Sequence, residues 1–204
     1  MNITSAQFMT SSAKVNQCPD TNVPEFAFIG RSNVGKSSLI NMLCNHKGLA
    51  KVSGTPGKTQ LINHFNINNG EWNLVDLPGY GYAKVPLGEK AKFLNIITDY
   101  ALKRQQLTMF FVLVDVRHSV QTVDRNFMEF LGLNGIPFAI IFTKADKVKG
   151  NELDTNIARY KQEMLKTWET LPPMFVTSSQ KHQGRDLLLA YIESVINNVK
   201  ENKK

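Results

Sequence analysis

The sequence has few cysteines, no long hydrophobic run and no signal-like N-terminus, and each absence excludes a class of protein. Its 2 cysteines, Cys18 and Cys44, stand far apart and form no Cys-x-x-Cys motif, so neither a disulfide framework nor a zinc site is predicted. The apolar runs, such as those at 110–114 and 138–142, are far shorter than the roughly 20 residues that span a bilayer. Residues 1–12 lack the basic start and apolar block of a secretory signal. We therefore expect a cytoplasmic protein without a membrane segment.

Acidic residues are missing from one long stretch of the chain. No Asp or Glu occurs between Glu25 and Glu71, and the whole chain carries 24 Lys and Arg against 17 Asp and Glu, for a net charge of +7. Such an excess attracts polyanions such as a nucleotide or RNA. It fits a solvated basic surface as well, and charge alone does not decide between the two. The cations in this stretch are Arg31, Lys36, Lys47, Lys51 and Lys58.

The remaining composition is that of a globular protein. Hydrophobic residues make up 42% and charged residues 20% of the chain, with 13 Gly and 8 Pro, and these values exclude a disordered, collagen-like or coiled-coil protein. A chain of 204 residues can bury about 70% of its unfolded surface. We expect one domain at 24–199, with an N-terminal arm at 1–23 and a basic tail at 200–204.

Apolar segments of strand length alternate with segments of helical period, which predicts an α/β fold. Asn69-Gly70 lies in the short gap between the second and third segments and favours a hairpin turn. We expect a six-stranded, mostly parallel sheet with one antiparallel strand and with helices on both faces. The expected strands are 26–29, 61–67, 72–75, 109–114, 138–142 and 174–176.

Residues 30–37 read Gly-Arg-Ser-Asn-Val-Gly-Lys-Ser and match the phosphate-binding pattern G-x-x-x-x-G-K-[ST]. The match lies between an apolar strand and an expected helix at 38–45, as the pattern requires. The glycines let backbone N–H groups turn towards phosphates at a helix N-terminus. Lys36 then reaches the terminal phosphates, and Ser37 offers its hydroxyl to Mg²⁺. The alternative is a chance glycine-rich turn, which the flanking strand and helix argue against.

A second motif, Asp76-Leu77-Pro78-Gly79, closes the third expected strand. This position is the carboxyl edge of the sheet, where Asp76 can orient water on Mg²⁺ and Gly79 can direct its N–H at a γ-phosphate. Alone, the D-x-x-G pattern is also an ordinary turn sequence. The pattern indicates a nucleotide site here because it follows the phosphate loop in the sequence.

A third motif, Thr-Lys-Ala-Asp at 143–146, follows the fifth expected strand and indicates the base. Guanine carries two adjacent donors, N1–H and the 2-amino group, which the Asp146 carboxylate can accept together. Adenine would leave that carboxylate unpaired, and such sites reject the wrong ligand strongly. The stem of Lys144 can lie along the ring, and Ser178 and Ser179 are placed to offer a backbone N–H to the guanine carbonyl. Alone, residues 143–146 equally fit a solvated loop.

In order and spacing these motifs resemble the Ras-like switch GTPases, and more narrowly the EngB family (also called YihA or YsxC) in the Era-like group. The resemblance covers about residues 8–198. It implies a Ras-like P-loop GTPase fold and a cytosolic, Mg²⁺-dependent GTPase that binds GTP and GDP. It also implies association with the large ribosomal subunit and its rRNA during assembly, and a need for the protein in cell division and septation. We expect a monomer. The matching segments are 30–41, 56–60, 76–83, 143–147 and 178–179.

The resemblance assigns roles to single residues. Lys36, Thr59 and Gly79 would act in hydrolysis, and Ser37 and Thr59 would bind Mg²⁺. Thr59 would bind the metal only with GTP present, so losing the γ-phosphate should release 47–60; a rigid surface loop is the alternative. The residues expected to contact the nucleotide are Gly30, Arg31, Ser32, Asn33, Val34, Gly35, Lys36, Ser37, Ser38, Gly57, Lys58, Thr59, Gln60, Leu61, Asp76, Leu77, Pro78, Gly79, Thr143, Lys144, Ala145, Asp146, Thr177, Ser178 and Ser179.

Three residues depart from the Ras pattern or add to it. Tyr80 stands where Ras-type enzymes carry the glutamine that orients water, so we expect slow intrinsic hydrolysis, on the order of 10⁻⁴ per second, that rises with the ribosomal partner. Asn33 resembles the asparagine with which some Era-like enzymes hold K⁺ beside the phosphates, and it equally fits a loop cap. Thr143 replaces the more general asparagine, as is common in the EngB family.

Three function classes stay open. In the first, GTP hydrolysis times release from the ribosomal particle; in the second, nucleotide merely tunes rRNA affinity and hydrolysis is incidental. The third, a kinase that uses ATP, would leave residues 143–146 without a role. The four histidines lack metal-ligand neighbours in the sequence and are expected in the core or at the surface. They are His46, His64, His118 and His182.

Overall fold

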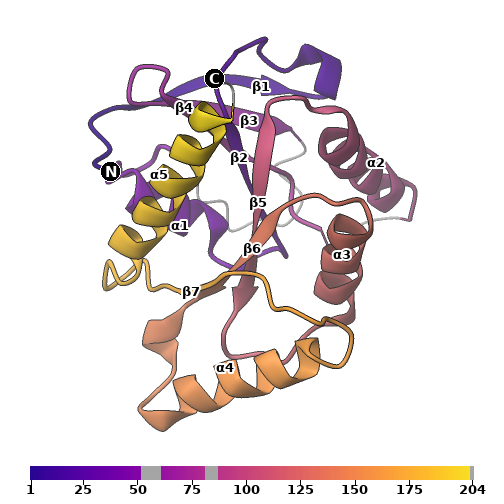
Figure 1. Cartoon of the computed structure of the whole chain (residues 1–204), viewed down its shortest axis with the longest axis vertical. Helices are drawn as coiled ribbons and strands as arrows, with labels where there is room; N and C mark the ends of the chain where they lie inside the picture. The colour runs from indigo at the N-terminus through magenta and orange to yellow at the C-terminus, as the bar shows by residue number, and fades with distance from the viewer. Residues whose placement is uncertain (52–60, 81–86, 203–204) are drawn as a thin grey trace.

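The computed structural model describes residues 1–51, 61–80 and 87–202, with backbone alone at 87–93. In this part of the chain a seven-stranded sheet, in the order β1-β3-β4-β2-β5-β6-β7, has helices on both faces (Figure 1). The strands are β1 (Ala6–Ser12), β2 (Glu25–Gly30), β3 (Ile62–Ile67), β4 (Trp72–Asp76), β5 (Leu107–Asp115), β6 (Phe138–Thr143) and β7 (Met174–Val176). The helices are α1 (Lys36–Leu43), α2 (Leu87–Lys103), α3 (Thr122–Leu133), α4 (Asn151–Met164) and α5 (Arg185–Glu201), with 3₁₀ turns at Val15–Gln17 and Ala145–Lys147.

The central strand β2 is buried along its whole length because its apolar run packs on both faces of the sheet. Phe26 and Phe28 face the core formed with α1 and α5, whereas Ala27 and Ile29 face the core formed with α2, α3 and α4. The pairs β2–β4, β2–β5, β5–β6 and β6–β7 are parallel. The predicted α/β sheet is confirmed.

The hairpin predicted at Asn69-Gly70 is also confirmed. Asn68, Asn69 and Gly70 have φ values of 52°, 55° and 94°, a left-handed conformation that Asn and Gly adopt at low cost. The chain therefore reverses between β3 and β4, which are antiparallel, and β3 also pairs antiparallel with β1. In the described sheet β3 is the one strand that runs against the others.

The prediction of six strands is wrong by one, because the N-terminal arm contributes β1. This strand lies at the edge of the sheet and is joined to β3 by backbone hydrogen bonds, with a register shift between Phe8 and Thr10. Of its seven residues only Ser12 is fully buried, and Phe8 is 55% exposed. An edge strand that buries so little side-chain surface leaves no hydrophobic pattern in the sequence.

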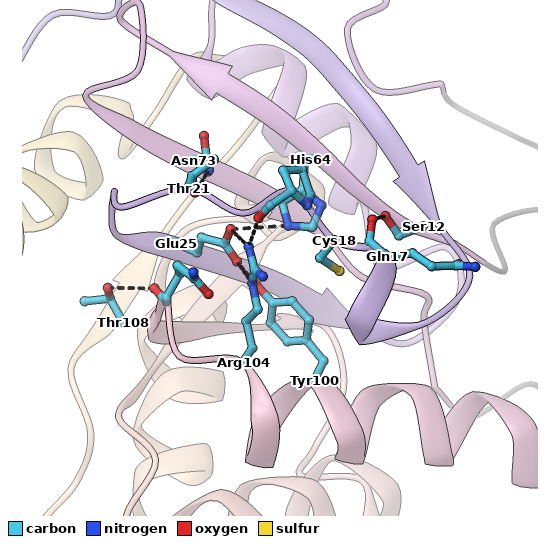
Figure 2. A network of polar contacts seen from close by, with 12 residues as sticks. Ser12, Gln17, Cys18, Thr21, Glu25, His64, Asn73, Tyr100, Arg104 and Thr108 are labelled. Carbon is cyan, nitrogen blue, oxygen red and sulfur yellow. Dashed lines mark hydrogen bonds and ion pairs between the residues drawn. The ribbon is translucent and has the colours of Figure 1, made fainter.

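A buried network of charged residues joins α2 to the sheet (Figure 2). The Glu25 carboxylate is fully buried and accepts hydrogen bonds from Tyr100 Oη at 2.7 Å and from Arg104 Nε and Nη2 at 2.9 and 2.6 Å. His64 Nε2 lies 3.4 Å from the same carboxylate. Burial opposes ionisation of Glu25, but the hydrogen bonds from Arg104 and the nearby His64 ring lower its pKa to about 2. His64, expected in the core or at the surface, is a core residue.

The carboxyl ends of four parallel strands meet at one edge of the sheet, where nucleotides bind in open α/β folds. These ends are Gly30 of β2, Asp76 of β4, Asp115 of β5 and Thr143 of β6. The sequence motifs therefore converge in space. Within the described ranges, every helix is too short or too polar to cross a membrane.

Candidate nucleotide-binding site

The loop between β2 and α1 has the backbone of a phosphate cradle. Gly35 has a φ of 103° and Asn33 a φ of 61°, so the chain turns sharply before α1 begins at Lys36. A Cβ on Gly30 would lie 2.7 Å from the Leu113 carbonyl oxygen, so only glycine allows β5 to approach so closely. The first N–H groups of α1 have no partner within the helix, as at every helix N-terminus, and can bind an anion.

Lys36 and Asp76 meet at the end of this loop. Lys36 Nζ donates a hydrogen bond to the Asp76 carboxylate, which is 4% exposed at the end of β4. The chain then stays against the loop: Leu77 N–H bonds to Phe28 O at 3.1 Å and Tyr80 N–H to Gly30 O at 3.3 Å. The D-x-x-G motif, with Gly79, thus lies directly beside the phosphate loop.

The oxygen donors at this place fit Mg²⁺, a hard cation that prefers hydroxyl, carboxylate and phosphate oxygens. Ser37 stands in the first turn of α1 and Asp76 at the neighbouring strand end. Among the described residues there is no group of three or more His, Cys, Asp or Glu that could hold a metal ion. Thr59, expected as the second metal ligand, lies outside the described residues, as do Gly57, Lys58 and Gln60.

Arg31 and Tyr80, which pair with each other through an isolated backbone bridge, direct their side chains towards α3. Arg31 Nε lies 3.2 Å from Asp124 Oδ2, and Asp124 is 1% exposed in the first turn of α3. The Tyr80 ring packs on Phe127 with 5.1 Å between centroids, and its hydroxyl is buried. Burial raises the pKa of Asp124, although Arg31 opposes this effect.

The third motif closes the other end of the site. The buried Thr143 hydroxyl lies 2.7 Å from Val34 O and 3.1 Å from Val114 O, so it ties the phosphate loop to the sheet. Lys144, with a φ of 61°, donates from Nζ to Asn33 O at 2.6 Å. The phosphate loop and the segment that carries Asp146 are therefore held in one fixed relation.

Asp146 is oriented by two neighbours. Ser178 Oγ donates to its Oδ1 at 2.6 Å, and Lys147 Nζ lies 3.2 Å from its Oδ2. The Ser178 hydrogen bond is the main cause of the lowered pKa of Asp146, and Lys147 adds to it. A carboxylate held ionised in this way accepts two adjacent N–H donors well.

The segment after β7 completes this end of the site. Ala145 N–H bonds to Thr177 O at 3.1 Å, and Ser178 N–H bonds to Gln183 O at 3.2 Å. Because its N–H is already used, Ser178 acts here through its hydroxyl, a role that the sequence did not suggest. Ser179 keeps the expected contact to guanine as a prediction. Leu61, also expected near the nucleotide, is 38% exposed.

Asp115 is a residue of this site that the sequence reasoning missed. It ends β5, is 5% exposed, and its Oδ2 lies 3.0 Å from Lys144 Nζ. Arg117 donates to the same carboxylate from Nε at 2.9 Å and from Nη2 at 2.7 Å. Burial opposes ionisation, but these hydrogen bonds from Arg117 and Lys144 hold the pKa of Asp115 well below its usual range. The signal available in the sequence was a carboxylate at the end of an apolar strand.

Comparison with known protein families gives a match over most of this region. A family model described as "50S ribosome-binding GTPase" matches residues 25–144. "Probable GTP-binding protein EngB" of Bacteroides fragilis is 59% identical over 195 residues, which cover 96% of each chain. The protein of the same name from Bacteroides thetaiotaomicron is 57% identical over 203 residues and covers 100% of both chains.

Solved structures share the fold. A crystal structure of a probable GTP-binding protein engB superposes with a TM-score of 0.64 at 23% identity, over 85% of this chain and 99% of the other. Era from Aquifex aeolicus, bound to GDP and aluminium fluoride, gives a TM-score of 0.65 at 22% identity, over 83% and 56% of the two chains. At such identities the likeness concerns the fold alone.

Proposed function

This chain belongs to the EngB family of GTP-binding proteins, and we propose that it is a slow GTPase that acts as a switch in assembly of the large ribosomal subunit. GTP and GDP would bind between the phosphate loop and Asp146. The support for ribosome association is the matching family description, together with the basic net charge of +7.

One observation carries the nucleotide assignment: the Asp146 carboxylate is fixed in place relative to the phosphate loop. Ser178 orients it, and Thr143 and Lys144 tie its segment to Val34 and Asn33 in that loop. A guanine base on Asp146 would therefore leave its phosphates at the N-terminus of α1. Adenine lacks the two donors that this carboxylate accepts, so ATP should compete poorly.

The test is Asp146→Asn, which keeps the shape of the side chain but removes the charge and one acceptor. We expect GDP affinity to fall about 100-fold or more, since one of the two hydrogen bonds from the base is lost and the other no longer involves a charged group. Xanthosine diphosphate, whose 2-oxo group accepts an amide N–H, should bind the variant better than the wild type. The matched control is Asp154→Asn on exposed α4, which should bind GDP normally. Unchanged GDP affinity in Asp146→Asn, or equal binding of ATP and GTP to the wild type, contradicts the assignment.

We assign hydrolysis to Lys36, Gly79 and Mg²⁺, with the metal held by Ser37 and Thr59. Bound Mg²⁺ would supply charge stabilisation at the β- and γ-phosphates. Tyr80 supplies no group that orients water, because its ring packs on Phe127 and its hydroxyl is buried. Intrinsic turnover should therefore be about 10⁻⁴ per second, as in unassisted Ras, and should rise with large subunits. Equal single-turnover rates with and without subunits would refute this.

Potassium dependence stays a proposal that rests on Asn33. Its side chain is exposed in the phosphate loop, and its carbonyl accepts the Lys144 hydrogen bond. Hydrolysis rates measured in KCl and in NaCl test the potassium dependence, and identical rates would contradict it.

A second candidate function is a ribosome-binding module in which hydrolysis is incidental. Tyr80 favours this alternative, because it supplies no group that orients the attacking water. The two functions differ in the off-rate from the large subunit with GTP and with a non-hydrolysable analogue. A much slower off-rate with the analogue supports the switch, and similar rates support the module. Under either function we propose a cytoplasmic monomer whose depletion lowers mature large subunits and disturbs septation, measured by gradient sedimentation and microscopy.

A further inference from the structure

We infer that a basic hollow beside α4 binds phosphate groups of ribosomal RNA. This inference rests on the ribosome association proposed above and adds the surface that makes the contact. The α4 hollow has a volume of about 560 Å³ and lies between residues 117–120 and one face of α4. Its charged members are Arg117, Arg159, Glu163 and Lys166, and His118 lies among them. Its volume is within the range of about 300–1,000 Å³ that ligand sites span.

The charge balance around the hollow is positive. Glu163 is already matched by two cations, since Arg125 Nη2 lies 2.8 Å from one of its oxygens and Lys166 Nζ 2.5 Å from the other. Arg159 is exposed and has no ion pair in the described parts of the chain. An anion that enters the hollow therefore meets cations in excess, and no unmatched carboxylate opposes it.

The hollow is preformed. Arg117 is held by two hydrogen bonds to Asp115, yet its side chain remains 43% exposed, so its guanidinium is oriented before any partner arrives. Tyr160, 3% exposed, lines the hollow and packs edge-on against Phe142 with 5.0 Å between ring centroids. A fixed arginine loses little side-chain freedom when it binds phosphate.

The chemistry favours RNA over a protein partner. Val120 and Tyr160 are the only apolar or aromatic residues among those that line the hollow; the others are charged or polar. The core of a protein–protein interface is depleted of charge, whereas phosphate contacts of nucleic-acid-binding proteins come from Arg, Lys and polar side chains. We therefore assign the α4 hollow to the RNA backbone.

The hollow also lies next to the nucleotide site. Arg117 and His118 line both the α4 hollow and a smaller one of about 180 Å³ that is bordered by Asn33 and Lys144. Arg117 shares the Asp115 carboxylate with Lys144. An RNA phosphate on Arg117 would thus share its guanidinium with Asp115, whose other partner is a lysine of the guanine-binding motif. RNA and nucleotide would contact the protein through adjoining residues.

The experiment reverses one charge on each side of the same helix. Arg159→Glu reverses a charge that lines the hollow. The control, Lys161→Glu, makes the same charge change two residues later, about 200° around α4. Lys161 is exposed and does not line the hollow. Each variant is sedimented with purified large ribosomal subunits between 50 and 200 mM KCl. A phosphate contact predicts that Arg159→Glu loses roughly tenfold or more in affinity at about 0.1 M salt and that its salt slope is smaller by about one. Lys161→Glu should keep nearly the wild-type affinity and slope.

The outcomes separate this inference from the function on which it rests. Equal affinity losses in Arg159→Glu and Lys161→Glu overturn the α4 hollow as the contact. A loss confined to Arg159→Glu but without a change in salt slope overturns RNA as the partner, because the contact would then be to a ribosomal protein. If the wild type fails to bind subunits in every nucleotide state, the proposed function fails instead. GDP affinity should be unchanged in both variants, which verifies that they are folded.

Discussion

Replacing Glu25 by glutamine tests the buried network that fastens α2 to the sheet (Figure 2). The wild-type carboxylate accepts hydrogen bonds from Tyr100 and Arg104, and Arg104 is only 7% exposed. Glutamine keeps the shape but leaves the Arg104 charge buried without a counter-charge. Breaking a buried ion pair from one side costs about 3–5 kcal/mol, so Glu25→Gln should lower the free energy of unfolding at pH 7 by about that amount.

The pH dependence of that loss follows from the pKa of Glu25. A lowering from 4.5 to about 2 means that ionised Glu25 contributes roughly 3 kcal/mol of stability above pH 4.5. Because the folded-state pKa is the lower one, this contribution is lost as the pH falls from 4.5 towards 2. About 1 kcal/mol should be gone at pH 3.5 and about 2 kcal/mol at pH 3. Glutamine does not titrate, so the stability gap between wild type and variant should narrow by these amounts.

Urea unfolding between pH 7 and pH 3 measures the difference in the free energy of unfolding between the wild type and Glu25→Gln. Other carboxylates titrate in both proteins and cancel in the difference. Glu169→Gln, at an exposed position, removes a carboxylate outside the network and should show no narrowing against the wild type. Tyr100→Phe removes one hydrogen bond to Glu25 and should cost about 1–3 kcal/mol, so it provides a milder test if Glu25→Gln does not fold. A gap between wild type and Glu25→Gln that stays constant from pH 7 to pH 3 would refute the reasoning.

The parts of the fold that local patterns encode were predictable. Buried parallel strands carry continuous apolar runs, and the turn at Asn69-Gly70 needs the left-handed conformations that these residues adopt easily. The phosphate loop was likewise predictable, because its glycines, lysine and serine lie next to one another in sequence. β1 was not predictable, since backbone pairing with β3 rather than side-chain burial holds it. Its formation depends on a partner strand about fifty residues away.

Contacts between the motifs were beyond the reach of sequence reasoning for a related reason. Asp115 gains its role from the register of β5 and β6, which places it beside Thr143 and within 3.0 Å of Lys144 Nζ. Ser178 was expected to act through its N–H, but the pairing with Gln183 occupies that group and leaves the hydroxyl for Asp146. In both cases the residue and its neighbourhood were visible in the sequence, while the atom that makes the contact was set by tertiary packing.

Two further substitutions test the proposed guanine end of the site. Gly184 has a φ of 79°, and a Cβ there would lie 2.2 Å from Val176 O. Gly135 has a similar φ of 64° but open space around the position of a Cβ, so Gly135→Ala introduces backbone strain alone. Gly184→Ala should therefore lower the free energy of unfolding in urea by roughly 1–3 kcal/mol more than Gly135→Ala. Equal costs would contradict the steric argument. Asp115→Asn removes the charge that holds Lys144, a lysine at the base end of the site. Both nucleotides carry the same base, so calorimetry should show that the affinities for GTP and for GDP fall by the same factor, roughly tenfold. A loss confined to GTP would place the effect of Asp115 at the γ-phosphate and not at the base.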